Sequence, residues 1–245
     1  MSDYDDFIKY IKGGHAKALD YLSKENGRYE FPAVVAGVAV YDNYAFRHAA
    51  LNGPLAIVDR LLQKSADGIY EFPDVVGDIA ARSNYALRRA ACNGHLAIVD
   101  RLLGKKEDGA YEFPAVVNEI AVLNNEFLQV AARNGRLEIV ERLLGKKKDG
   151  SYEFPDVVGD IAARSNYALR WAAENGHLAI VERLLGKKED GTHEFPAVVC
   201  GVAANNNEAL RLAARNSHHE TSCLLAQVAC QVFQICQKSL RVMLR

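Results

Sequence analysis

Apolar residues recur at helical spacing in short segments that polar turns separate. In residues 95–103 one helical face carries Leu96, Val99, Leu102 and Leu103. Asp100 and Arg101 fall on the other side, so the pattern predicts an amphipathic helix with one buried face. Asn93-Gly94 comes just before it and indicates a helix end, because glycine adopts the left-handed conformation there without a Cβ penalty.

Two further helices are predicted upstream of this segment. Pro73 suits the first position of a short helix over 74–80, because it lacks only an N–H that would be unbonded there. Asn84 precedes a longer helical segment, 85–91, and its carboxamide is predicted to act as the N-cap. The equivalent asparagines in the other copies are Asn43, Asn125, Asn166 and Asn207.

This three-helix pattern is an internal repeat of constant length. Glu-Phe-Pro begins at Glu30, Glu71, Glu112, Glu153 and Glu194, always at the same interval, and residues 74–88 are identical to residues 156–170. A unit of this size buries little surface alone, so the copies are expected to stack as an all-α solenoid with specialised ends. The predicted parts are an N-terminal capping half-repeat 1–29, repeats 30–70, 71–111, 112–152 and 153–193, a degenerate repeat 194–222, and a C-terminal capping helix 223–245.

Paired alanines are predicted to mark where the longer helices pack closely on their neighbours, since no larger side chain occurs there. These pairs lie at 49–50, 90–91, 131–132, 172–173 and 213–214.

Composition and net charge indicate a folded protein and argue against some classes of partner. The chain is 49% hydrophobic and 25% charged, which is typical of a folded protein. Thirty Lys and Arg against 31 Asp and Glu give a net charge of −1, which argues against a nucleic-acid partner. The acidic N-terminus and the lack of a long apolar run favour a soluble chain without a signal peptide.

The cysteines indicate neither a disulfide framework nor a metal site. They number five, an odd count, and they fall at unrelated positions: Cys92, Cys200, Cys223, Cys230 and Cys236. A reducing cytoplasm fits this pattern best.

The segment ALRRAACNGHLAIVDRLL, residues 86–103, resembles the ankyrin repeat. The resemblance covers the helix–turn–helix part of each copy, recurring four times well and once in degraded form. It implies an all-α array that binds protein partners on a concave helix face.

The family's usual hairpin is replaced here by GKKEDGxYEFPxVV, which does not favour projecting β-hairpins. In composition the chain is similar to ankyrin-like arrays of bacteria that live inside eukaryotic cells, some of which are secreted effectors. HEAT or armadillo repeats are the alternative, but neither predicts the AAxNGHL turn.

Three columns of the longer helix vary between otherwise constant copies, and they share one helical face. We interpret them as a strip that binds a protein partner, with Trp171 and Tyr167 as anchors, because aromatic residues and arginine dominate interface hot spots. The alternative is that Trp171 only fills a gap between helices. The predicted strip comprises Tyr44, His48, Tyr85, Arg89, Cys92, Val130, Arg133, Tyr167, Trp171, Glu174 and Leu212.

Two other segments carry weaker candidate sites. Stacking would align Lys105-Lys106, residues 146–148 and Lys187-Lys188 along one edge, but neighbouring acids favour a solvated rim over an anion-binding one. The C-terminal segment places Gln and basic residues, including Lys238, Arg241 and Arg245, at spacings of three and four. A terminal cap is favoured over a membrane-binding or oligomerising helix, because an array must cover its last apolar face.

No motif points to catalysis or to a cofactor. Cys92 and His95 lie within one turn, but His177 recurs without a cysteine and no third orienting group is placed. His218 and His219 near Cys223 do not have zinc-ligand spacing. We therefore expect a non-catalytic, monomeric scaffold without cofactor or metal that acts in the cytoplasm, or in a host cytosol if it is a bacterial effector. The alternative is a peripheral membrane or oligomerising protein that acts through residues 223–245.

Overall fold

The computed structural model describes residues 2–243, and the side chains of all of these except 122–123, 204–205 and 235–243. Lys238 and Arg241, part of the tail prediction, therefore lie outside the described side chains, and Arg245 lies outside the described residues. The chain forms two compact units, residues 1–120 and 121–245.

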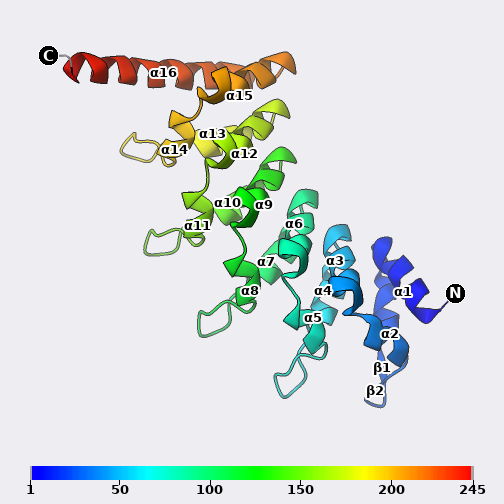
Figure 1. Cartoon of the computed structure of the whole chain (residues 1–245). Helices are drawn as coiled ribbons and strands as arrows, with labels where there is room; N and C mark the ends of the chain where they lie inside the picture. The colour runs from blue at the N-terminus through cyan, green and yellow to red at the C-terminus, as the bar shows by residue number, and fades with distance from the viewer. Residues whose placement is uncertain (1, 244–245) are drawn as a thin grey trace. The chain divides into compact units, whose positions relative to one another are not determined.

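The first unit stacks its longer helices beside one another, α1 on α3 and α3 on α6, with the shorter η1, α4 and α7 as a second row (Figure 1). Its elements are α1 (Asp3–Lys12), the 3₁₀ helix η1 (Ala16–Leu22), β1 (Lys24–Glu25), β2 (Arg28–Tyr29), α2 (Pro32–Gly37), α3 (Val40–Asn52), α4 (Leu55–Leu61), α5 (Pro73–Gly77), α6 (Ala81–Asn93), α7 (Leu96–Leu102) and α8 (Pro114–Asn118).

The second unit repeats this arrangement, with α9 packed on α12, α12 on α15 and α15 on α16. Its elements are α9 (Val122–Arg133), α10 (Leu137–Leu143), α11 (Pro155–Gly159), α12 (Ala163–Glu174), α13 (Leu178–Leu185), α14 (Pro196–Cys200), α15 (Ala204–Arg215) and α16 (His219–Met243).

The three helices expected in each copy are present. Pro73 occupies the start of α5 as predicted, and Phe72 before it is buried. In α7 the predicted face is buried at Val99, Leu102 and Leu103, with Leu96 at its edge. The paired alanines are fully buried up to Ala213, whereas Ala214 is exposed because the last long helix has no further copy to pack against.

The predicted N-cap role of the asparagines is wrong. Asn84 lies inside α6, and Arg82, Ser83 and Asn84 have φ values of 55°, 54° and 56°, so that one left-handed turn precedes the regular helix. The carboxamide makes no cap bond, and its Nδ2 instead donates to the carbonyl of Val116 in the next copy at 2.7 Å. Sequence reasoning missed this turn, although Asn and Ser are common residues in left-handed segments.

The same carboxamide bond recurs from copy to copy. Its donor–acceptor pairs are Asn43 to Val75 (2.7 Å), Asn125 to Val157 (2.7 Å) and Asn166 to Val198 (2.6 Å). Each bond satisfies a buried backbone carbonyl of the following short helix, so the asparagine fixes the distance between neighbouring copies.

The loops between copies are hairpins. The sequence had not favoured hairpins here, because the segment GKKEDGxYEFPxVV replaces the usual hairpin of the family. Residues of β1 and β2 pair antiparallel, with Lys24 opposite Tyr29. Later loops keep one antiparallel bridge each, between Lys64 and Tyr70, Lys105 and Tyr111, Lys146 and Tyr152, and Lys187 and His193. In each unit these loops extend from the ends of the helices (Figure 1).

The last helix, α16, is a single element that starts where a shorter second helix begins in earlier copies. Of its described side chains, Thr221, Leu225 and Val228 are buried, whereas Phe233 is 63% exposed. Among the described residues, no helix is both long and apolar enough to cross a membrane.

Candidate functional site

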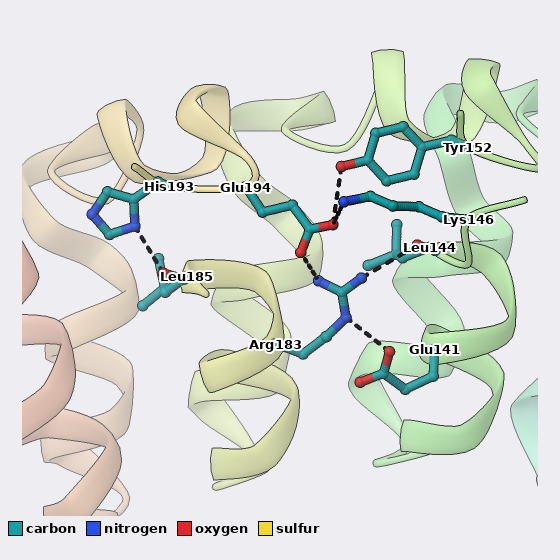
Figure 2. A network of polar contacts seen from close by, with 8 residues as sticks. All are labelled: Glu141, Leu144, Lys146, Tyr152, Arg183, Leu185, His193 and Glu194. Carbon is teal, nitrogen blue, oxygen red and sulfur yellow. Dashed lines mark hydrogen bonds and ion pairs between the residues drawn. The ribbon is translucent and has the colours of Figure 1, made fainter. Parts of the chain in front are cut away.

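Each copy is tied to the next by the glutamate of Glu-Phe-Pro. In Figure 2, Glu194 accepts from Arg183 Nη1 at 2.7 Å, from Lys146 Nζ at 2.9 Å and from the Tyr152 hydroxyl at 3.1 Å. Arg183 also donates through Nε to Glu141 at 2.8 Å and through Nη2 to the Leu144 carbonyl at 3.2 Å. One carboxylate thus joins Arg183 of the preceding copy to the hairpin one copy further back.

The first unit contains the same network around Glu112. This carboxylate accepts from Arg101 Nη1 at 2.5 Å, Lys64 Nζ at 3.0 Å and the Tyr70 hydroxyl at 3.0 Å. Burial raises the pKa of Glu112, but the hydrogen bonds from Lys64, Arg101 and Tyr70 outweigh it and leave the pKa below its ordinary value. The pKa values of Glu71 and Glu194 are lowered by the same balance.

A histidine that follows a long helix contacts the end of the long helix in the preceding copy. The Nε2 of His95 lies 3.1 Å from the Leu51 carbonyl oxygen, near the end of α3. Its ring lies against Gly53, which has φ of +88°, and a Cβ there would approach the ring to 2.4 Å. His177 and His218 bond the carbonyls of Arg133 and Glu174 in the same way. These histidines are structural, as the repeat pattern indicated.

The helix face left open by these contacts carries the predicted strip residues. In the first unit, the rings of Tyr44 and His48 are 4.3 Å apart. The Tyr85 ring has the guanidinium of Arg89 at 4.9 Å and that of Arg47 at 5.1 Å. Arg89 is exposed and the rings are half-buried, so they are open to solvent at their edges.

A second aromatic cluster lies on the second unit. The rings of Tyr167 and Trp171 are 4.0 Å apart, and the guanidinium of Arg133 is 4.5 Å from the Trp171 ring. Arg170 lies 4.8 Å from the Tyr167 ring and forms an ion pair with Glu208 of the next copy. Trp171 itself is half-buried.

The comparison with protein families settles what these copies are. The family model described as ankyrin repeats (3 copies) matches residues 46–156 and 128–235, which is most of the chain. The chain belongs to the ankyrin repeat family. Its fold class is accordingly an all-α solenoid, as the hydrophobic pattern predicted. Searches of curated proteins and of solved structures returned no match.

Ankyrin repeats are generally protein–protein interaction modules, and proteins built from them are typically non-enzymatic scaffolds. In this ankyrin array none of the predicted strip residues is sealed in the core. Arg89 and Arg133 are exposed, and the half-buried members are Tyr44, His48, Tyr85, Cys92, Val130, Tyr167, Trp171, Glu174 and Leu212. The structure brings together Tyr44 with His48, Tyr85 with Arg89, and Trp171 with Tyr167 and Arg133.

Sequence reasoning missed a neighbouring column of the ankyrin repeats and a pocket beside it. The column holds Arg47, Arg88, Gln129, Arg170 and Arg211. The pocket lies in the first unit, has a volume of 890 Å³ and is lined by Tyr4, Asp5, Ile8, Lys9, Lys12, Tyr41, Tyr44, Arg47, His48, Arg82 and Tyr85. The contribution of α1 was not expected, because residues 1–29 were interpreted only as a cap.

The lysines of the loops are not simply a solvated rim. The first lysine of a loop pairs with the Glu-Phe-Pro glutamate two copies further along the chain, as Lys64 does with Glu112 and Lys146 with Glu194. Part of their charge is therefore used to hold the ankyrin repeats in register.

The described residues contain no group of three or more His, Cys, Asp or Glu side chains placed to hold a metal ion. Cys92 is half-buried, and Cys200, Cys223 and Cys230 are exposed free thiols.

Proposed function

We propose that this ankyrin array binds a protein partner through the open face of its longer helices. The observation that carries this proposal is that every residue of the predicted strip is exposed or half-buried, while the paired alanines shared by the copies are buried up to Ala213. Two aromatic clusters with adjacent arginines, at Tyr85 and at Trp171, provide the residue types that dominate interface hot spots.

The test is partner capture with paired variants. Tagged wild-type chain and a Trp171→Ala/Arg89→Ala variant are used in pull-downs from candidate host cytosol, with bound proteins measured by quantitative mass spectrometry. A matched control, Lys106→Ala/Glu189→Ala, changes two exposed loop residues instead. The proposal expects one set of proteins to be lost at least about tenfold with the first variant and kept with the control. Equal capture by all three chains would contradict it.

The resemblance to arrays of intracellular bacteria supports a more specific role, that of a secreted effector in a host cytosol. A translocation reporter fused to the chain tests this role: signal inside the host cell that depends on the secretion system of the bacterium would support it, and signal confined to the bacterium would contradict it.

A second candidate function rests on α16. The buried side chains among those described in this helix lie between Thr221 and Val228, whereas Phe233 is exposed and the helix continues to Met243. This extension supports a peripheral membrane or oligomerising role as the alternative. Truncation after Gln231 should abolish liposome flotation or self-association if the extension performs either, and should leave both unchanged if α16 is only a cap.

A further inference from the structure

The pocket of the first unit contains a buried positive charge without a negative partner. Arg47 is only 6% exposed. Its Nε donates to the Asp42 carbonyl at 2.7 Å and its Nη2 to the Tyr41 carbonyl at 2.9 Å. Within the part of the chain that the structure describes, no carboxylate pairs with it. Burying a charge is costly unless an opposite charge compensates it.

The matching position of another copy shows how this protein normally compensates such an arginine. Arg170 of α12 pairs with Glu208, which comes from the following copy. Arg88 has Glu126 at the corresponding place in its following copy, and the neutral Gln129 has Tyr167 there. Arg47 breaks this pattern, because Tyr85 occupies that place in the copy after it.

Asp5, the acid that lines the pocket, and Asp42, next to the lining residue Tyr41, are both already engaged. Asp5 accepts from the backbone N–H and hydroxyl of Ser2, at 3.0 and 2.8 Å. Asp42 pairs through its carboxylate with Arg82 Nε at 2.8 Å. Lys12, by contrast, lies with Nζ 5.4 Å from the Tyr44 ring centroid and pairs with no described acid. The pocket therefore has excess positive charge.

Two neighbouring groups are consistent with an incomplete site. Burial, with added repulsion from Lys12 and Arg47, lowers the pKa of His48. The Tyr4 hydroxyl is buried and makes no hydrogen bond to any described residue, which is unusual for a buried polar atom.

We propose that this pocket binds a side-chain carboxylate from an acidic segment of a protein partner, with Arg47 as its main ion-pair donor and Tyr44 and Tyr85 in contact with the flanking apolar atoms. A carboxylate is favoured over other anions because Glu208 supplies one to the equivalent arginine of α12. This inference rests on the proposed function, since it names the chemistry of the partner at the N-terminal part of the same helix face.

Gln129 supplies the matched substitution for the test. It occupies the column of Arg47 and bonds the backbone carbonyl of Asn124, which precedes it in α9, at 2.5 Å. Arg47→Gln should therefore keep a hydrogen bond to the backbone carbonyl of Asp42 in the left-handed turn while removing the positive charge. Arg170→Gln changes the net charge by the same amount at an arginine that already has its acid, and it serves as the control.

Fluorescence anisotropy of two labelled peptides, ELEELE and its uncharged counterpart QLQQLQ, tests the inference on the full chain. Wild type should bind ELEELE at least about tenfold more tightly than QLQQLQ. Arg47→Gln should weaken ELEELE binding about tenfold or more, and Tyr85→Glu should do the same because it supplies the missing acid internally. Arg170→Gln should change binding less than about twofold, with circular dichroism confirming that each variant is folded.

Four outcomes would overturn the inference: no ELEELE binding at millimolar peptide, equal affinity for the two peptides, equal losses in Arg47→Gln and Arg170→Gln, or displacement of ELEELE by inorganic phosphate at lower concentration than by acetate. The proposed function is tested separately. If ELEELE binding fails while partner capture still requires Trp171 and Arg89, only this inference is wrong. If ELEELE binding requires Arg47 while partner capture does not depend on Trp171 and Arg89, the proposed partner-binding role of the wider helix face is wrong.

Discussion

At the scale of single residues, the asparagine that ends each left-handed turn makes the most consequential contact. Asn84 is buried, its backbone has positive φ, and its side chain donates to the Val116 carbonyl. The sequence singled out this asparagine because it precedes the longer helix, but predicted that its carboxamide would accept from the first turn of that helix, whereas its Nδ2 donates to the next copy. Helix N-caps and left-handed turns favour the same small polar residues, so residue type alone does not separate them.

Asn84→Ala should destabilise the chain by about 2 kcal/mol, because the Val116 carbonyl loses its donor in a buried site and Ala is poorly suited to positive φ. Denaturant unfolding measures the loss. Ser83→Ala is the control, since Ser83 has the same backbone conformation and donates no such bond. A loss for Ser83→Ala as large as that for Asn84→Ala would show that the turn, rather than the hydrogen bond, sets the cost.

The pKa of His48 should respond to the charge of Lys12. Burial lowers this pKa first, and the positive charges of Lys12 and Arg47 lower it further, while Tyr44 stacks on the ring. The pocket's other charged or titratable side chains are Asp5, Lys9, Arg82, Tyr4, Tyr41 and Tyr85. Lys12→Gln should raise the pKa of His48 without restoring its ordinary value, as measured by NMR titration of the ring protons. Lys17→Gln, beside Tyr10, should leave it unchanged.

At the scale of elements, the Glu-Phe-Pro segment combines three tasks in three consecutive positions. The proline starts a short helix, the phenylalanine is buried, and the glutamate accepts from donors of an earlier hairpin. The sequence made the first two predictable. The third requires Lys64 and Tyr70, which lie more than one full copy before Glu112, and only the hairpin shape of the loop brings them to it.

Glu112→Gln should destabilise the chain by about 1–3 kcal/mol at neutral pH, because three donors lose a charged acceptor. A folded-state pKa below the unfolded value means that the ionised carboxylate contributes stability above the ordinary pKa of 4.5 and loses it as pH falls through the lowered folded value. The loss of wild-type stability in acid should therefore be shallower in the variant. Glu107→Gln, in the same loop, is the control, and an unchanged acid profile for Glu112→Gln would contradict this assignment.

At the scale of the whole molecule, the sequence predicted the fold class, the three helices of each copy and the accessible helix face. It did so because nearly constant copies separate shared positions from variable ones, and shared apolar positions pack between copies. It did not predict the left-handed turns, the hairpins or the pocket beside Arg47. The left-handed turns and the hairpins are local backbone conformations that residue type alone did not reveal. The pocket beside Arg47 and the pairing of Arg170 with Glu208 instead join side chains from different copies.

Nearest-neighbour stacking also makes destabilisation local. Glu194→Gln should speed amide hydrogen exchange in α13, α14 and the hairpin at 144–153, which supply or adjoin its donors, and should leave exchange in α3 and α4 unchanged. Hydrogen exchange with mass spectrometry measures both regions in one experiment. A uniform increase along the chain would instead indicate that the copies unfold as one cooperative body.

The glutamate network has a consequence for how such a chain can change length. Glu71, Glu112 and Glu194 each accept from an arginine of the copy before and from a lysine and a tyrosine of the hairpin one copy further back. Duplicating or deleting one whole copy therefore preserves this pairing, whereas an insertion of any other size interrupts it. Gene duplication can thus lengthen or shorten the array without redesign, and substitutions in a single copy then revise the recognition surface one row at a time.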